Sequence, residues 1–92
     1  MIEITTLPKK QVFVCVNERT DGRNCCKNVG GEEIVQELKK FVKDNHKNDV
    51  WVTRSRCLGF CNAVGPTIII YPEQKMFTQV TKEDVEEIKK RM

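Results

Sequence analysis

Two cysteines four positions apart, Cys57 and Cys61, constrain the fold of this chain more than any other feature. The three residues between them include Gly59, and a Gly-Pro step soon leads into the apolar run 67–71. Because glycine adopts positive φ without strain, the backbone can curl closely around a ligand here. Such a turn also directs N–H groups inward, which suits sulfur atoms that carry negative charge. A disulfide, a metal site and ordinary burial are all compatible with this stretch alone.

The expected cellular compartment helps to choose among a disulfide, a metal site and ordinary burial. The chain has five cysteines in 92 residues, and residues 1–16 lack the layout of a signal peptide. Their basic pair follows a short mixed segment, and the next apolar run already has the pattern of a strand. We therefore expect a cytoplasmic protein, and disulfides rarely persist in the cytoplasm. Five cysteines in that setting indicate metal or redox chemistry rather than covalent cross-links.

Length and composition exclude several classes of protein. A chain of 92 residues is expected to form a single domain over residues 1–92. Its 39% hydrophobic and 32% charged residues are typical of a globular protein and not of a disordered one. No apolar run, that of residues 68–71 included, approaches the ~20 residues of a membrane span. The net charge of +3 is mild and the lysines are spread out, so nucleic acid is not an expected partner.

Hydrophobic periodicity predicts six elements in the order β-α-β-β-β-α, an α/β fold with a mixed four-stranded sheet and helices. One helix begins near Gly30 with an acidic pair in its first turn, and Thr81 caps the other in a weak capping box with Asp84. The third strand is apolar on both faces, which predicts a position inside the sheet. The predicted strands are residues 11–16, 50–53, 67–71 and 76–78.

The cysteines gather near the ends of these elements. Cys15 lies at the end of the first strand, and Cys25 and Cys26 lie in the polar loop before the first helix. Cys57 and Cys61 lie in the loop between the second and third strands. If the first strand neighbours the third, both loops open at the same end of the sheet and bring their thiols together. Thiolates bind both zinc and iron–sulfur clusters, so the residue types alone leave the metal open.

The spacing Cys15-x10-Cys26-x30-Cys57-x3-Cys61 resembles that of the thioredoxin-like [2Fe-2S] ferredoxins, also called Shethna-type ferredoxins. It is similar, too, to the [2Fe-2S] domain of the small flavoprotein-associated subunit of respiratory complex I. The segments that carry the resemblance extend over residues 11–91 and read VFVCVNER, CCKNVGGEE, RCLGFCNAVGPTIIIYPE and VTKEDVEEIKKR.

This resemblance implies a thioredoxin-like fold and a one-electron carrier, not an enzyme, with a [2Fe-2S] cluster as cofactor. It implies that Cys15 and Cys26 bind one iron, and that Cys57 and Cys61 bind the other. A one-residue shift of the loop would make Cys25 the ligand in place of Cys26. The resemblance also implies redox partner proteins, a reductase or oxidoreductase, and possible assembly as a homodimer.

Two other functions stay open on the residues alone. The same four thiols suit a zinc-stabilised binding module. A thiol-disulfide redox protein is disfavoured because the chain has no C-x-x-C at a helix N-terminus, where a thiolate is normally stabilised. Arg54 and Arg56 flank the second cysteine loop, either as solvated charges or as a basic rim that offsets the charge of a thiolate-bound cluster.

Overall fold

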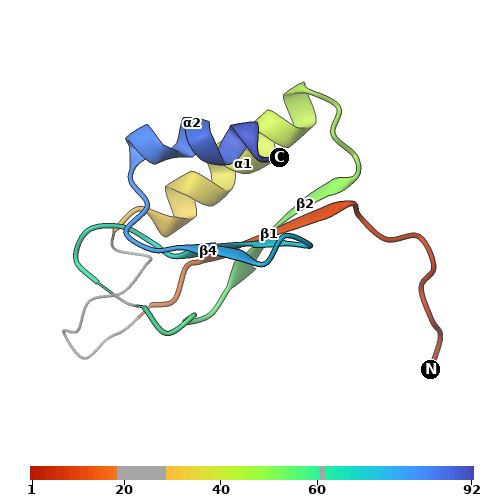
Figure 1. Ribbon diagram of the computed structural model, residues 1–92, viewed down its shortest axis with the longest axis horizontal. Coiled ribbons are helices and arrows are strands. Elements are labelled where there is room, and N and C mark those ends of the chain that lie inside the picture. The colour runs from red at the N-terminus through yellow and green to blue at the C-terminus, as the bar shows by residue number, and fades with distance from the viewer. Residues whose placement is uncertain (19–28, 61) are drawn as a thin grey trace.

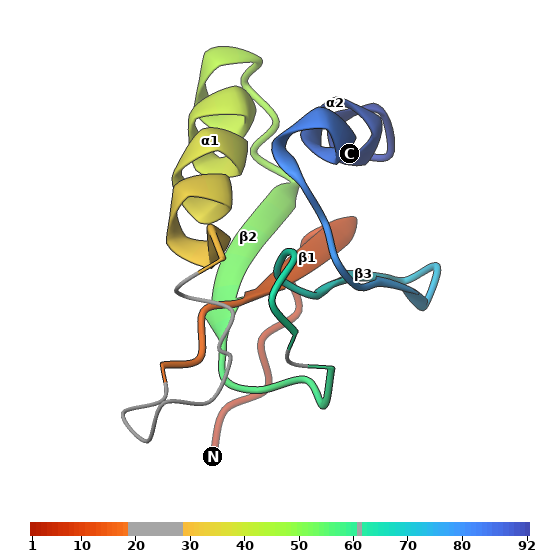
Figure 2. The same cartoon turned by 90° about the vertical axis from the view of Figure 1, so that its left-hand side faces the viewer.

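The computed structural model describes residues 1–18, 29–60 and 62–92. They form a four-stranded sheet with two helices packed on one of its faces (Figures 1 and 2). The predicted order β-α-β-β-β-α is confirmed, and each strand boundary lies within two residues of the predicted one. The elements are β1 (Lys10–Cys15), α1 (Gly31–Asp44), β2 (Val50–Ser55), β3 (Ile68–Tyr71), β4 (Lys75–Phe77) and α2 (Lys82–Lys90).

The sheet is mixed, with the strand order β2-β1-β3-β4. β1 pairs in parallel with β2 and antiparallel with β3, and β3 pairs antiparallel with β4. A parallel pair needs a crossover connection, and α1 supplies it between β1 and β2. β3 lies between β1 and β4, which confirms the internal position that its apolar run predicted.

The hydrophobic core lies between the sheet and the helices. Alternate strand residues face the helices, because successive side chains of a strand point to opposite faces. The apolar faces predicted for the two helices supply the other side of the core. Its buried members on these elements are Val12, Val14, Val50, Val52, Ile68 and Ile70 from the strands, with Ile34, Val35, Leu38, Val85 and Ile88 from the helices.

The start of α2 is fixed to the segment that follows the second cysteine loop. The Val80 N–H donates to the Pro66 carbonyl oxygen at 3.1 Å. A Cβ on the adjoining Gly65 would lie 2.0 Å from the Val80 carbonyl oxygen, so only glycine allows this approach. The predicted cap is also present, since the Thr81 N–H donates to the Asp84 carboxylate at 3.0 Å. In the part of the chain that the structure describes, no helix is long and apolar enough to cross a membrane.

Gly65→Ala should lower the free energy of unfolding by about 2–3 kcal/mol, because the added methyl group has to displace the Val80 backbone. Denaturant titration followed by circular dichroism measures this change. Lys39→Ala, at an exposed position on α1, is the control and should change it by less than about 0.5 kcal/mol. Equal stability of the two variants would contradict the close approach.

Candidate metal centre

The parallel pairing of β1 with β2 brings the ends of both strands to the same end of the sheet. Cys15, the last residue of β1, is paired with Ser55, the last residue of β2. The Val16 N–H donates to the Ser55 carbonyl oxygen at 2.9 Å and extends this contact by one residue. Cys57 follows Ser55 by two residues, so Cys15 and Cys57 lie at one end of the sheet.

Cys15 is held between two strands and is fully buried. Its N–H donates to the Thr67 carbonyl oxygen at 2.9 Å, and the residue before it, Val14, is paired with Ile68 of β3. Its backbone therefore has little freedom, and its sulfur is held by a rigid element.

Cys57 is exposed and lies in the tight turn that its sequence predicted. Its Sγ accepts a hydrogen bond from the Gly59 N–H at 3.3 Å. Gly59 has a φ of 93°, which confirms the expectation that glycine permits this turn. A backbone N–H directed at sulfur stabilises the thiolate, the form of cysteine that binds metals.

Asn62 anchors the far side of this loop, and sequence reasoning missed its role. Its Oδ1 accepts from the N–H groups of Val64 at 2.7 Å and Gly65 at 2.9 Å, and its Nδ2 donates to the Phe60 carbonyl oxygen at 3.0 Å. Asparagine side chains often bond the backbone two residues further on in turns, as Asn62 does with Val64, and this preference was the available signal. The loop is thus folded by its own side chain before it enters β3.

Arg54 and Glu32 connect the two elements that flank the cysteine loops. Arg54 Nε donates to both carboxylate oxygens of Glu32, at 3.1 and 2.9 Å, and Nη2 donates to Oε1 at 2.6 Å. This two-pronged contact joins the end of β2 to the first turn of α1, and the Glu32 hydrogen bond raises the pKa of Arg54. The charge of Arg54 is therefore paired with Glu32 and links two elements of the fold, while Arg56 is exposed. No local pattern relates two residues 22 positions apart, so the pair was not predictable.

Three of the predicted ligand residues, Cys25, Cys26 and Cys61, lie outside the described residues. Within residues 1–18, 29–60 and 62–92, no group of three or more histidine, cysteine or acidic side chains is arranged to hold a metal ion. The structure thus positions Cys15 and Cys57, and the complete ligand set remains a prediction.

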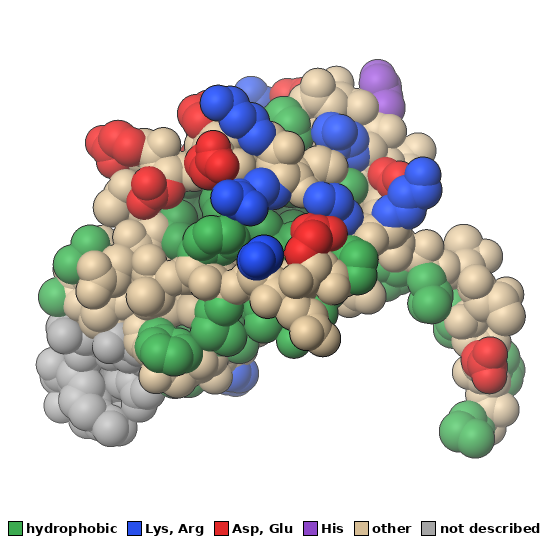
Figure 3. Space-filling view, viewed as in Figure 1, with side chains coloured by type: hydrophobic (Ala, Val, Ile, Leu, Met, Phe, Trp, Pro, Cys, Tyr) green, Lys and Arg blue, Asp and Glu red, His purple; other side chains and the backbone are tan. Residues whose placement is uncertain are grey.

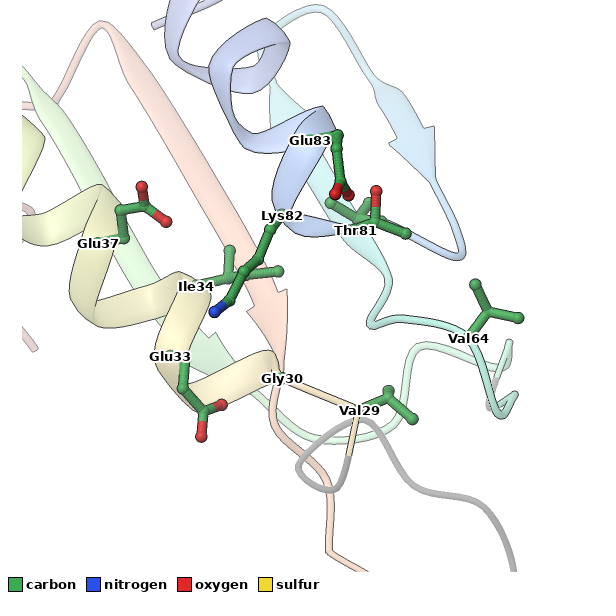
Figure 4. A pocket seen from close by; sticks show the side chains of 10 residues that line it. Val29, Gly30, Glu33, Ile34, Glu37, Val64, Thr81, Lys82 and Glu83 are labelled. Carbon is green, nitrogen blue, oxygen red and sulfur yellow. The ribbon is translucent and has the colours of Figure 1, made fainter.

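A groove of about 490 Å³ opens between the first turns of α1 and α2 (Figure 4). Its charged lining consists of Glu33, Glu37 and Glu83 with a single cation, Lys82. Sequence reasoning did not identify it, because its two walls are 50 residues apart along the chain. Glu37 is already paired with Lys89 at 3.3 Å. Glu33 and Glu83 still outnumber Lys82, and this small negative surplus favours positively charged groups.

Comparison with known proteins relates the chain to two curated proteins, both called "Ferredoxin, 2Fe-2S". The one from Clostridium pasteurianum is 33% identical over 84 residues, which cover 88% of this chain and 81% of that protein. The one from Aquifex aeolicus is 31% identical over 83 residues, which cover 86% of this chain and 74% of that protein. No family model matches the sequence.

The crystal structure of the thioredoxin-like [2Fe-2S] ferredoxin from Aquifex aeolicus superposes with a TM-score of 0.80 and 30% identity. The match covers 91% of this chain and 84% of that one. Together with the identity to the clostridial protein, this shows that the chain belongs to the thioredoxin-like [2Fe-2S] ferredoxin family.

The two described cysteines should differ sharply in reactivity. In reduced, metal-free protein, iodoacetamide should alkylate the exposed Cys57 at least about 100-fold faster than the buried Cys15, because the reaction needs an accessible thiolate. Peptide mapping by mass spectrometry measures both rates, and unfolded protein is the control in which the rates converge. Equal native rates would contradict the burial of Cys15.

Proposed function

We propose that this chain is a one-electron carrier whose [2Fe-2S] cluster is bound by Cys15, Cys26, Cys57 and Cys61. The observation that carries the proposal is the register of β1 against β2, which puts Cys15 and Cys57 at one end of the sheet. Membership of the ferredoxin family supports the choice of cluster over zinc. The cluster supplies reversible one-electron chemistry, and the protein is not required to provide catalytic acids or bases.

The donors present fit such a cluster. Thiolates are the ligands of [2Fe-2S] centres, and hydrogen bonds to their sulfurs and solvent exposure set the reduction potential. Cys57 Sγ already accepts the Gly59 N–H, while Cys15 is buried. Cys15 is therefore shielded from water, whereas Cys57 lies close to solvent. An electron would have a short path from the Cys57 side to a docked partner protein.

Redox partner proteins are the proposed binding partners, as reductase or oxidoreductase. The groove between α1 and α2 supports partners with basic side chains, since Glu33 and Glu83 outnumber Lys82 there while Glu37 is paired with Lys89. Val29 and Gly30, which end the first cysteine-bearing segment, form part of its lining. We further propose a cytoplasmic location and a homodimer.

Purified protein handled without oxygen should be brown, bleach with dithionite, and contain two irons and two acid-labile sulfides per chain. A visible absorption spectrum, with assays of iron, zinc and acid-labile sulfide on the same sample, tests for the cluster. A colourless protein with one zinc per chain, which stays colourless after cluster reconstitution, would overturn the proposal and favour the zinc-stabilised module.

Single substitutions test the ligand set. Cys57→Ser and Cys61→Ser should abolish or distort the visible spectrum, because serine replaces a thiolate ligand with a harder oxygen. Cys26→Ser should do the same, whereas Cys25→Ser is the matched control and should leave the spectrum nearly unchanged. If Cys25→Ser destroys the spectrum and Cys26→Ser does not, Cys25 is the ligand.

A further inference from the structure

Thr67 is buried directly before β3, and its side chain carries a hydroxyl group. Within residues 1–18, 29–60 and 62–92 it is the only polar or charged residue that is buried, with 1% of its surface exposed. The next three residues are all isoleucine, so an aliphatic side chain would suit this position. A buried hydroxyl lowers stability unless hydrogen bonds replace its contacts with water. The contacts of this hydroxyl therefore indicate what it does.

The main chain of Thr67 is fixed to the first predicted ligand. Its carbonyl oxygen accepts the Cys15 N–H at 2.9 Å, at the end of β1. The preceding carbonyl oxygen, that of Pro66, accepts the Val80 N–H at 3.1 Å and ties the same segment to the chain before α2. Because these contacts use the backbone, Thr67 keeps its position relative to Cys15 whatever its side chain is.

The Thr67 side chain reaches the second cysteine loop together with Thr78. Thr67 Oγ1 lies 3.1 Å from Thr78 Oγ1 and 3.5 Å from the Phe60 carbonyl oxygen. Thr78 Oγ1 lies 3.4 Å from the same carbonyl oxygen. With one proton on each hydroxyl, one threonine can donate to the other while the second donates to Phe60. Neither contact with the carbonyl oxygen is short, so the two hydroxyls act as a pair.

Burial of its own side chains does not hold this loop. Phe60 is 53% exposed and Val64 is 55% exposed. Figure 3 shows hydrophobic side chains on the surface at the end of the molecule where the loop lies in Figure 1. Asn62 Nδ2 donates to the Phe60 carbonyl oxygen at 3.0 Å, but this contact only folds the loop on itself. The threonine pair instead joins that oxygen to β3 and to the segment after β4.

We propose that the hydroxyls of Thr67 and Thr78 are positioning groups of the metal centre. They hold the loop that carries Cys57 in a fixed place relative to Cys15, which the Thr67 backbone holds on the other side. Neither threonine contacts a metal in this arrangement, so each acts through the backbone of the loop. The proposal rests on the proposed function, because it assigns the two hydroxyls to the centre that the four cysteines form.

The hydroxyl pair acts on sulfur through Gly59. Phe60 directly follows Gly59, whose N–H donates to Cys57 Sγ at 3.3 Å. A hydrogen bond to a thiolate ligand favours the reduced state of a cluster, which carries one more negative charge, and so raises the reduction potential. A fixed Phe60 carbonyl oxygen keeps the Gly59 N–H directed at the sulfur. A loop released from the threonines loses part of this hydrogen bond, which lowers the potential.

The double variant with Thr67→Val and Thr78→Val removes both hydroxyls and keeps the branched shape of the side chains. Voltammetry of the cluster-containing protein should show a lower midpoint potential. Loss of visible absorption to an iron chelator should become about 10-fold faster or more, because partners that orient metal ligands have effects of this size. Either substitution alone should have a smaller effect, since the remaining hydroxyl still reaches the Phe60 carbonyl oxygen.

Two double variants are the controls. Thr67→Ser with Thr78→Ser retains both hydroxyls and should restore the potential and the rate of cluster loss. Thr5→Val with Thr53→Val removes two hydroxyls from exposed positions and should change neither. The metal-free double valine variant should not unfold at a lower temperature than the wild type. The Phe60 carbonyl oxygen keeps its hydrogen bond from Asn62, and a buried valine needs no partner.

The outcomes separate this positioning role from the electron-carrier function. A brown double valine variant with the wild-type potential would overturn the positioning role and leave the function intact, even if cluster loss or the unfolding temperature changed. A double valine variant that folds but stays colourless, beside a brown double serine variant, would support the role. A colourless wild-type protein with one zinc per chain would overturn the function and the positioning role together.

Discussion

The parallel pairing of β1 with β2 is the contact on which the candidate site depends. The ladder ends at Cys15 opposite Ser55, and the chain enters the CLGFC loop two residues later. A register shift of one residue would move each side chain to the other face of the sheet. The alternating valines resist this shift, because Val12, Val14 and Val52 would leave the core. Hydrophobic burial on one side of the sheet thus fixes where the thiols lie at its end.

Around this ladder, contacts between distant segments fix the described residues that border the cysteine loops. Arg54 joins the end of β2 to Glu32, which opens the helix after the first cysteine-bearing loop. Asn62 folds the second loop on itself, and Gly65 lets the chain pass close to the segment before α2. None of these residues is a proposed ligand, yet together they link the end of β2, the first turn of α1 and the segment before α2.

The two faces of the sheet have different chemical characters. The helix-covered face buries aliphatic side chains and places its charged residues, such as Lys10 and Arg54, against the helices. The opposite face is uncharged and carries Trp51, Tyr71 and Met76. The acidic groove between α1 and α2 is a third surface.

By itself, the sequence determined the element order, the internal position of β3, the Thr81–Asp84 cap and the turn at Gly59, because each depends on local periodicity or backbone preference. It also carried the cysteine spacing by which the family was recognised. Tertiary structure decided which strands pair, and therefore that Cys15 meets the end of β2 as well as β3. It decided the Arg54–Glu32 contact, the groove and the uncharged face, since these join residues far apart in the chain. Local patterns cannot specify such contacts, because they form only when the shared core brings distant segments together.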